Sequence, residues 1–295
     1  MTFLESVPLA GKTSYGIGGP ARYYVEPQSQ DDVVAAYRFA RERDLPVLVI
    51  GNGSNLLISD SGVDGLVINT SKFSTLTWVG PIATVTCGYH LDDFVADAVK
   101  RGYAGIEGLS GIPGTVGGAV VMNAGAFDAE VADTLSGVCV LRVPELSIEL
   151  VRPPEMALGY RTSVFKNSSD FIISAVFMFK AGDADKLISS RKSILAKRQE
   201  KQPLDSPSCG SVFKRPPGNY AGTLIESSGL KGFGTGGAKV SEKHANFIIN
   251  TGGAKAEDVR GVIRHVQKTV YEDSGILLEP EVIFVGEFKE PLFGK

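Results

Sequence analysis

The chain has 295 residues, of which 43% are hydrophobic and 21% charged, and its formal net charge at pH 7 is -3. This composition is that of a globular protein with room for two or three domains, and it lacks the basic excess typical of proteins that bind nucleic acids or anionic membranes. Three cysteines cannot form a disulfide framework and indicate a reducing compartment, so we expect a cytoplasmic protein. The three histidines and three cysteines lie far apart in sequence, and we predict no metal site.

No targeting or membrane segment is expected. The first residues lack the basic and apolar stretches of a signal peptide. The longest apolar run, residues 171–179, has less than half the length that a bilayer span requires. It is typical of a buried strand instead.

The first hundred residues alternate between strand and helix patterns. We expect strands at residues 21–27, 45–50 and 65–69. Between the first two, apolar residues at helical spacing predict a helix over 29–44, and Ser29 with Asp32 forms a capping box at its start. This βαβ-like unit places a helix over a buried sheet.

The middle of the chain is richer in strand patterns. A strand at 84–88 precedes a helix at 91–101, which ends at Gly102. Further strands are expected at 136–143, 147–151 and 171–179. These strands are more consistent with antiparallel than with parallel pairing.

A basic amphipathic helix over 186–200 leads into the last part of the chain. There a strand at 246–250 precedes a helix at 256–273, Gly275 stands where a C-cap belongs, and a strand at 276–286 ends the pattern. The sequence therefore predicts an α+β fold with three parts. The predicted divisions are 1–75, 76–185 and 186–295.

Glycine is enriched, with 35 residues or about 12% of the chain against a usual ~7%. The loop GNGSN at 51–55 follows a buried strand, and its glycines allow consecutive amides to form a concavity for an anion such as phosphate. An ordinary turn between strands is the alternative. The loop at 111–126 is uncharged and rich in glycine, which suits a backbone lying against a flat ligand or a pyrophosphate. Residues 13–22 would supply a third wall.

Three polar residues stand out in the second half of the chain: Arg161 in GYRTS, Ser211 after Cys209-Gly210, and Glu281 in a terminal strand. Each has an ordinary explanation as well, since Arg161 would pair with Glu281 and Ser211 would cap a turn. Basic residues between 191 and 215 would grip a diphosphate or form a solvated rim. Cys209 has no histidine nearby in sequence, and we expect it to be a packing residue.

Taken in order, GNGSN, GIPGTVGGAVVMNAGA, GYRTS, PSCGSVFKRPPG and LEPEV resemble the UDP-N-acetylenolpyruvoylglucosamine reductase family, flavoenzymes of peptidoglycan precursor synthesis. The resemblance runs from about residue 10 to 287. It implies an FAD-binding domain of the vanillyl-alcohol-oxidase (PCMH) type in two subdomains, with a C-terminal α+β substrate domain. It also implies NADPH-dependent reduction of UDP-N-acetylglucosamine enolpyruvate to UDP-N-acetylmuramate.

The resemblance assigns roles to individual residues. Arg161 would contact the substrate carboxylate, Ser211 would protonate the α-carbon after hydride from reduced flavin reaches the β-carbon, and Glu281 would assist as an acid or electrostatic partner. Arg198 and Lys201 match basic positions near the diphosphate, and Arg215 belongs to the same basic cluster. The implied flavin-binding residues are Gly51, Asn52, Gly53, Ser54, Asn55, Gly111, Ile112, Pro113, Gly114, Gly117, Gly118 and Asn123.

Only 39 residues, 162–200, separate Arg161 from Lys201, which is typical of the shorter subtype without an inserted tyrosine-bearing loop. One alternative is an alcohol or sugar oxidase of the same superfamily, which would carry a covalent-flavin histidine or cysteine near the first loops, yet no histidine precedes His90. The other is a non-enzymatic module that binds a flavin or a nucleotide sugar. The expected partners are small molecules, with no nucleic acid or membrane, and we expect a monomer.

Overall fold

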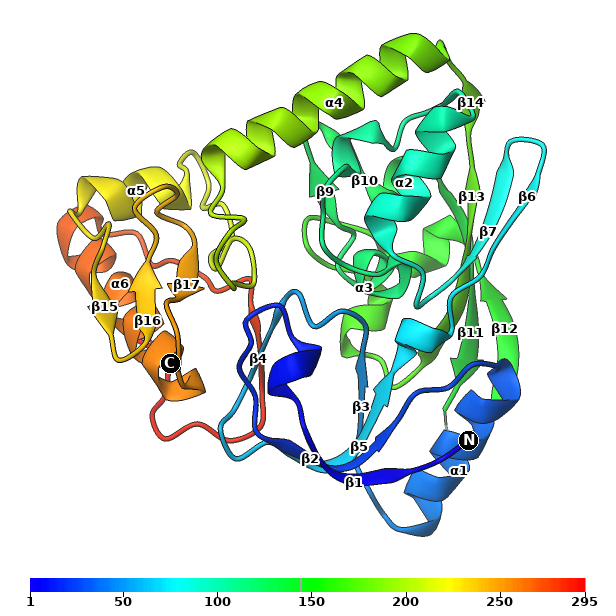
Figure 1. The fold of residues 1–295 in the computed structure, drawn as a ribbon, viewed down its shortest axis with the longest axis horizontal. Helices are drawn as coiled ribbons and strands as arrows, with labels where there is room; N and C mark the ends of the chain where they lie inside the picture. The colour runs from blue at the N-terminus through cyan, green and yellow to red at the C-terminus, as the bar shows by residue number, and fades with distance from the viewer. Residues whose placement is uncertain (144, 295) are drawn as a thin grey trace. The chain divides into compact units, whose positions relative to one another are not determined.

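The computed structural model describes residues 1–143 and 145–294, and the chain divides into two compact units (Figure 1). Unit 1 comprises residues 1–3, 25–52 and 67–198. Unit 2 comprises residues 4–24, 53–66 and 199 to the C-terminus. Segments of the first 66 residues thus fold with the last third of the chain. The division into three domains stays a prediction.

A five-stranded antiparallel sheet forms the centre of unit 1, with the order β12-β11-β13-β7-β6. Its strands are β6 (Leu76–Val79), β7 (Ile82–Thr86), β11 (Leu135–Arg142), β12 (Ser147–Val151) and β13 (Phe171–Met178). The four strands predicted in this region are present. β6 was not predicted, because its four residues are too few to show a clear alternation.

The helices of unit 1 are α1 (Gln30–Glu42), α2 (Leu91–Lys100), α3 (Val116–Val121) and α4 (Ala184–Lys201), the last three residues of which belong to unit 2. The three helices predicted in this part of the chain begin and end close to the predicted positions, whereas the short helix α3 was not predicted. The Ser29 hydroxyl accepts the Asp32 amide at 3.2 Å, which confirms the predicted cap of α1. Gly102 follows α2 with a φ of +76°, a conformation that glycine adopts without strain.

An aromatic cluster holds α2 to the sheet. Phe94 of α2 lies 4.9 Å from Phe177 of β13, measured between ring centroids. Trp78 of β6 lies 5.1 Å from Tyr103 and 5.7 Å from Phe179. The short helix α3 packs against β7 and β13. These contacts attach α2, α3 and the glycine-rich residues between them to the five-stranded sheet.

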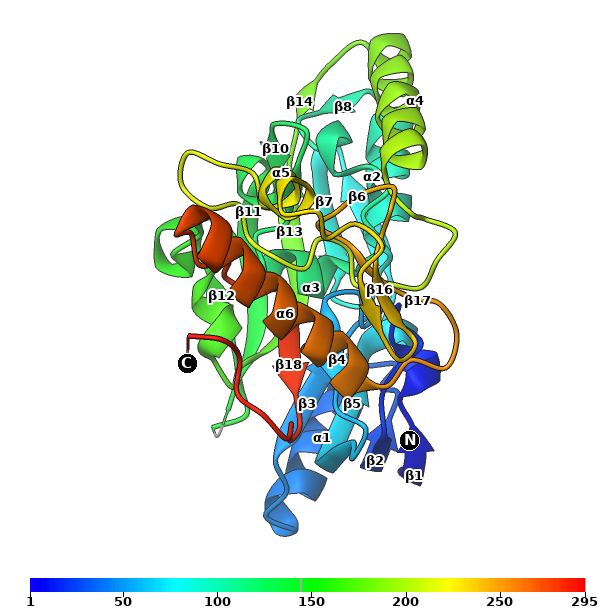
Figure 2. The same cartoon turned by 90° about the vertical axis from the view of Figure 1, so that its left-hand side faces the viewer.

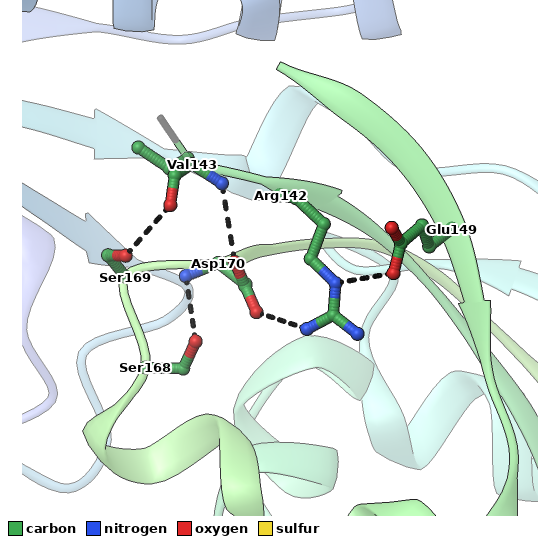
Figure 3. A network of polar contacts seen from close by, with 6 residues as sticks. All are labelled: Arg142, Val143, Glu149, Ser168, Ser169 and Asp170. Atoms are coloured by element: carbon green, nitrogen blue, oxygen red, sulfur yellow. Dashed lines mark hydrogen bonds and ion pairs between the residues drawn. The ribbon is translucent and has the colours of Figure 1, made fainter. Parts of the chain in front are cut away.

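One polar network joins the ends of β11, β12 and β13 (Figure 3). The Arg142 guanidinium donates to Glu149 at 2.8 Å and to Asp170 at 2.6 Å. Asp170 also accepts the Val143 amide at 3.3 Å, and its own amide donates to the Ser168 hydroxyl at 3.0 Å. The network therefore ties the start of β13 to the end of β11.

A second sheet has the order β1-β2-β5-β3. Its strands are β1 (Leu4–Pro8), β2 (Pro20–Val25), β5 (Val63–Asn69) and β3 (Val47–Ile50). β1 was not predicted, and it pairs antiparallel with β2. The boundary between the units falls within β2 and within β5. The shorter strands of the chain are β8 (Tyr103–Ala104), β9 (Gly125–Ala126), β10 (Ala129–Glu130) and β14 (Lys180–Ala181).

Unit 2 is built around the long helix α6 (Ala256–Ser274), which packs against β15 and β16 of a three-stranded sheet (Figure 2). The five apolar residues that the helical spacing placed on one face of α6 are all fully buried, and Gly275 ends the helix with a φ of +71°. The other elements are α5 (Ala221–Ser227), β15 (Gly234–Thr235), β16 (Ala238–Val240), β17 (Ile248–Asn250), β4 (Leu56–Ile58) and β18 (Ile283–Val285). The five residues on that face of α6 are Val259, Val262, Ile263, Val266 and Val270, and Ala256 and Gln267 of the same helix are buried as well.

The strand predicted over 276–286 was too long. Only β18 is regular strand, and it pairs in parallel with β4. Pro280 has no amide hydrogen and forms an isolated bridge with Phe213 instead of continuing a ladder. The residues before β18 therefore pair with a different segment.

Candidate functional site

Within unit 1, the first two residues of the loop 51–55 lie against the second glycine loop. The Asn52 side chain donates from Nδ2 to the Pro113 carbonyl at 2.7 Å. Gly51 lies so close to Thr115 that a side chain at position 51 would overlap the Thr115 hydroxyl. Thr115 in turn caps α3, because its Oγ1 accepts the Gly118 amide at 3.5 Å. The loop after β3 and the loop before α3 thus form one backbone surface.

Backbone hydrogen bonds hold the rest of the second loop. The Ile112 amide donates to the Leu109 carbonyl at 3.2 Å, and the Gly114 carbonyl accepts the Leu91 amide at 3.0 Å. Pro113 between them is exposed. The loop therefore has a defined shape while its tip faces solvent.

Two adjacent glycines of α3 have different surroundings. The Gly117 amide donates to the Cys87 carbonyl at 2.8 Å, and an added Cβ would stand 2.8 Å from the Cys87 Cβ. A Cβ added to Gly118 would meet only the Thr115 Oγ1, at 3.7 Å. Packing explains the glycine at 117 but not the exposed glycine at 118. The open face beside Gly118 suits a flat ring or a phosphate lying against the backbone.

One carboxylate on α2 connects the second loop with α4. Asp92 accepts the Gly111 amide at 2.6 Å and two hydrogen bonds from Arg191 at 2.6 and 2.9 Å. Burial would raise the pKa of Asp92, but the bonds from Arg191 and Gly111 outweigh it and lower the pKa below its ordinary value. Arg198 of α4 lies buried against Gly111, with its guanidinium 5.2 Å from the Phe127 ring centroid. The structure thus brings Arg198 to the predicted flavin loop.

Arg161 lies in a tight turn in which Gly159 and Thr162 exchange backbone hydrogen bonds at 3.1 and 3.2 Å. Its φ of +55° is one that residues with a side chain seldom adopt. Its Nη2 donates to the Gly125 carbonyl at 2.9 Å, and the guanidinium lies 5.0 Å from the Tyr160 ring centroid. Such strained residues persist where the surrounding structure holds them, and they are frequent in functional sites.

Asn123 contacts this turn. It is fully buried and has a φ of +40°. Its Nδ2 donates to the Gly159 carbonyl at 3.1 Å, and its Oδ1 accepts the Ala132 amide at 3.0 Å. The structure therefore places Asn123 beside the Arg161 turn, with both ends of its amide group bonded to backbone.

In unit 2 the chain turns sharply at Gly53, which has a φ of +58°. Gly53 is buried against the backbone of residues 12 and 13, and its carbonyl accepts the Ser14 amide at 3.4 Å. Within the described residues, no protein group accepts a hydrogen bond from the amides of Gly53, Ser54 and Asn55. Successive unpaired amides beside a left-handed residue form the concavity that binds phosphate oxygens.

The segment predicted as a third wall connects this turn with the residues that lead to Ser211. Ser14 and Ser208 exchange two hydrogen bonds: the Ser14 hydroxyl donates to the Ser208 carbonyl at 2.7 Å, and the Ser208 amide donates to the Ser14 carbonyl at 3.2 Å. The Asn55 side chain donates to the Glu281 carbonyl at 3.2 Å. Four candidate segments of unit 2 are thus joined by direct hydrogen bonds.

Ser211 and Glu281 stand on two segments that pair with each other. An antiparallel bridge joins Phe213 to Pro280, and the Glu281 amide donates to the Val212 carbonyl at 2.7 Å. Ser211 directly precedes Val212, so the two residues lie one position apart in this backbone pairing. Both residues are half-buried. Of the three predicted catalytic residues, these two lie on paired backbone segments within unit 2.

Asn246 is a residue of this region that the sequence analysis missed. It is buried, and its Oδ1 accepts the Phe213 amide at 3.0 Å while its Nδ2 donates to the Phe213 carbonyl at 2.9 Å. Its backbone carbonyl accepts the Val212 amide at 2.8 Å. A polar residue between the apolar Ala245 and Phe247 was the available signal, since a buried amide needs specific partners.

The two other predicted substrate residues of unit 2 are exposed. Lys201 is the last residue of α4. Arg215 follows the Ser211 segment, and its guanidinium lies 4.0 Å from the Tyr220 ring centroid. Long cationic side chains at such positions can reach an anionic ligand without the cost of burial.

Cys209 is a packing residue, as predicted. Burial raises the pKa of its thiol to about 12, and a thiol protonated at neutral pH is a poor nucleophile. Across residues 1–143 and 145–294 there is no group of three or more His, Cys, Asp or Glu side chains that could hold a metal ion. No helix in the described part of the chain is long and apolar enough to cross a bilayer.

Comparison with known proteins finds one matching family model in each half of the chain. A family model described as UDP-N-acetylenolpyruvoylglucosamine reductase, C-terminal domain, matches residues 202–285, and one described as FAD binding domain matches residues 21–144. A UDP-N-acetylenolpyruvoylglucosamine reductase of Caldicellulosiruptor bescii is 46% identical over 293 residues, which cover 99% of this chain and 93% of that one. The chain belongs to the UDP-N-acetylenolpyruvoylglucosamine reductase family.

Other members of the reductase family agree with this assignment. The reductase of Trichormus variabilis is 44% identical over 284 residues, covering 95% of this chain and 86% of that one. The crystal structure of the reductase from Thermus caldophilus matches with a TM-score of 0.83 and 33% identity, covering 97% of this chain and 98% of that chain. The family membership predicted from the motifs is confirmed.

The residues of this reductase-family chain fit FAD. The match to the FAD-binding domain includes both glycine loops. The open face beside Gly118 and the unpaired amides of Gly53 and Ser54 are the kinds of backbone surface that a flavin ring and a pyrophosphate need. The predicted α+β fold, with an FAD-binding domain and a C-terminal domain, is confirmed, as is the prediction of an FAD-dependent oxidoreductase. The roles of individual residues stay predictions.

Proposed function

We propose that this enzyme reduces UDP-N-acetylglucosamine enolpyruvate to UDP-N-acetylmuramate with NADPH as the reductant, as a step of peptidoglycan precursor synthesis in the cytoplasm. The observation that supports this most directly is the backbone pairing of the two segments that carry Ser211 and Glu281. When bound, FAD would accept a hydride from NADPH and pass it to the β-carbon of the enolpyruvyl group.

Arg161 binds the carboxylate of the enolpyruvyl group in this proposal. As the β-carbon gains a hydride, negative charge develops on the α-carbon and its carboxylate. A guanidinium held in place stabilises that charge without reorganising, and oriented donors of this kind contribute about 3–4 kcal/mol to a transition state. The turn at Gly159 and the bond to the Gly125 carbonyl supply such a fixed position.

Ser211 donates the proton that completes the product. The proton moves from its Oγ to the α-carbon, and the resulting alkoxide is reprotonated from solvent. Glu281 assists as an acid or as an electrostatic partner. A serine hydroxyl is a weak acid, so a neighbour must polarise it, and we assign this task to Lys201 or to a bound water.

The remaining candidate residues bind the cofactor and the substrate. Backbone and short side chains of loops 51–55 and 111–118 would hold the flavin and its pyrophosphate. Cationic groups grip phosphates through charge-assisted hydrogen bonds, and we assign the substrate diphosphate to such groups. They are Arg198, Lys201 and Arg215. We also expect a monomer, which light scattering of the purified protein would measure directly.

The visible spectrum of the purified protein tests the proposed reaction. We expect a yellow protein whose flavin absorbance is bleached by NADPH under anaerobic conditions and restored by the enolpyruvyl substrate, with UDP-N-acetylmuramate as the product. A protein that binds no FAD would refute the proposal. Bleaching by NADPH without reoxidation by the enolpyruvyl nucleotide would show a flavin reductase with a different substrate. Rapid reoxidation by oxygen alone would favour an oxidase.

A further inference from the structure

Asn123 is a polar residue of unit 1 in an unusual position. It follows α3 directly, is fully buried and has a φ of +40°. A buried amide group is retained only where its hydrogen bonds are satisfied, because an unsatisfied one destabilises the fold. Both ends of this amide are bonded to backbone, at the Gly159 carbonyl and the Ala132 amide.

The bonds of Asn123 end at the turn that carries Arg161. Gly159 is the first residue of that turn, two positions before Arg161. On the other side of the turn, the Ser163 hydroxyl donates to the Val121 carbonyl at 2.7 Å. The turn is therefore tied at both ends to the chain that leaves α3.

The guanidinium of Arg161 is tied to the same stretch of chain. Its Nη2 donates to the Gly125 carbonyl at 2.9 Å, and Gly125 lies two residues after Asn123. A backbone φ of +55° at Arg161 is unfavourable unless contacts on both sides hold it. Asn123 supplies one of those contacts, and aspartate or leucine in its place would lack the donor for the Gly159 carbonyl.

We propose that Asn123 is a positioning residue for Arg161: its bond to the Gly159 carbonyl fixes the turn so that the guanidinium meets the carboxylate of the substrate. This role rests on the proposed function, which gives Arg161 its ligand. A purely structural role would have Asn123 satisfy the Gly159 and Ala132 backbone groups with no consequence for the guanidinium. The two roles differ in what they predict for ligands that carry a carboxylate.

Two nucleotide sugars separate these roles in a binding experiment. UDP-N-acetylmuramate carries the carboxylate and UDP-N-acetylglucosamine lacks it. Removing one charge-assisted hydrogen bond corresponds to about a tenfold or larger change in affinity. We expect Asn123→Ala in the FAD-loaded protein to weaken calorimetric binding of UDP-N-acetylmuramate about tenfold and that of UDP-N-acetylglucosamine less than twofold.

A double-mutant cycle with Arg161→Gln makes the test specific. In the Arg161→Gln background, Asn123→Ala should change the affinity for UDP-N-acetylmuramate less than twofold, because the guanidinium that it positions is gone. Asn69→Ala is the matched control, since Asn69 is another buried asparagine of unit 1 and only caps a short helix at Ser71. It should leave both affinities unchanged.

Each other outcome overturns the proposal. Equal weakening of both ligands, or the same weakening with and without Arg161, would leave Asn123 a structural residue. Should Asn123→Ala fail to fold, Asn123→Asp keeps the acceptor for Ala132 and lacks the donor for Gly159, and it should show the same selective loss. A wild-type protein without any preference for the carboxylate would refute the proposed function, and the positioning role with it. A wild-type preference that Arg161→Gln abolishes and Asn123 variants leave intact would refute the positioning role alone.

Discussion

The turn of Arg161 in unit 1 and the segment of Ser211 in unit 2 both depend on a buried asparagine, but in different ways. Asn246 donates to and accepts from the same residue, Phe213, and so acts like one more rung of a β-ladder. Asn123 joins two separate segments, one at Gly159 and one at Ala132. The first asparagine reinforces a pairing that backbone bonds already make, whereas the second holds a turn with little regular pairing of its own.

This difference has a chemical reason. In the proposed mechanism Ser211 is a proton donor, which must stand at a fixed distance from one carbon atom, and a paired segment provides that rigidity. Arg161 must place a charged, long side chain at a precise orientation, and a left-handed backbone turn directs it where a regular strand would not. We expect substitutions around Ser211 to affect stability and catalysis together, and substitutions around Arg161 to affect mainly the recognition of charge.

Among the variants that test this difference, Ser211→Ala should have the largest effect on catalysis. We expect NADPH to bleach the flavin at the normal rate, while reoxidation by the enolpyruvyl substrate slows about 10²–10⁴-fold, the usual contribution of a positioned proton donor. Stopped-flow absorbance would measure the two half-reactions separately. Ser206→Ala, on the same loop, is the control and should change neither. If reoxidation stays normal in Ser211→Ala, the proton comes from elsewhere.

Asn246→Ala tests whether the Ser211 segment depends on its asparagine for stability. It removes two side-chain bonds and leaves the amide and carbonyl of Phe213 unsatisfied in a buried region, so the free energy of unfolding should fall by about 2–4 kcal/mol. Denaturant titration would measure it. Asn123→Ala should cost less, because the Gly159 carbonyl keeps its bond from the Thr162 amide and the Ala132 amide is the backbone group left without its partner. A larger loss for Asn123→Ala than for Asn246→Ala would reverse the comparison.

Much of the secondary structure could be predicted because its signals are local. The cap at Ser29, the buried face of α6 and the left-handed Gly275 were all evident from residues a few positions apart. The long strand expected over 276–286 was wrong because Pro280 and the bond from Glu281 to Val212 depend on a segment about 70 residues earlier in the chain.

The candidate site was predictable to a similar extent. The motifs indicated Ser211 and Glu281, and the structure places them on paired segments. Asn246 gave only a weak signal, since a single asparagine in a short strand pattern does not reveal which backbone groups it bonds. The grouping of residues 4–24 and 53–66 with the C-terminal third also depends on contacts that no local pattern contains.

Gly117 and Gly118 of α3 allow a further test within unit 1. This helix adjoins both the predicted flavin loop at 111–118 and the Arg161 turn. Gly118→Ala should leave the apo-protein as stable or gain about 0.5–1 kcal/mol from better helix propensity, since its Cβ meets only Thr115 at 3.7 Å. It should nevertheless weaken FAD binding by about 1–2 kcal/mol if the proposed flavin surface is correct, because the methyl group would enter that open space. Flavin fluorescence on titration would report the affinity.

Gly117→Ala is the matched variant, and it should do the opposite. Its Cβ would stand 2.8 Å from the Cys87 Cβ, so the apo-protein should lose about 1–3 kcal/mol of stability. If Gly118→Ala bound FAD as tightly as the wild type, the open face would not be the flavin surface.

The smallest effect is expected at Asp170, in the polar network that precedes β13 (Figure 3). Burial would raise the pKa of Asp170, but hydrogen bonds from Arg142, Ser168 and Val143 outweigh it and lower the pKa below its ordinary value of 3.8. A carboxyl group with a lowered pKa stabilises the folded state above its unfolded pKa, and this contribution is lost as the pH falls through the folded value. Because solvent screens the pair, Asp170→Asn should reduce the free energy of unfolding by less than about 1 kcal/mol at pH 7.

The pH dependence distinguishes this network from a simple loss of hydrogen bonds. The difference between wild type and Asp170→Asn should be constant from pH 7 down to about pH 5 and should shrink below about pH 4, where the wild-type carboxylate becomes protonated. Arg142→Gln should give the same pH profile, since it removes the other half of the pair. Substrate affinity should stay unchanged in both variants, because this network ends at Ser168 while Asn123 and Ser163 hold the turn. A loss of affinity for UDP-N-acetylmuramate in Asp170→Asn would mean that the conformation of the Arg161 turn depends on the Arg142–Asp170 network as well as on Asn123. The contrast between the Arg161 turn and the Ser211 segment would then no longer hold.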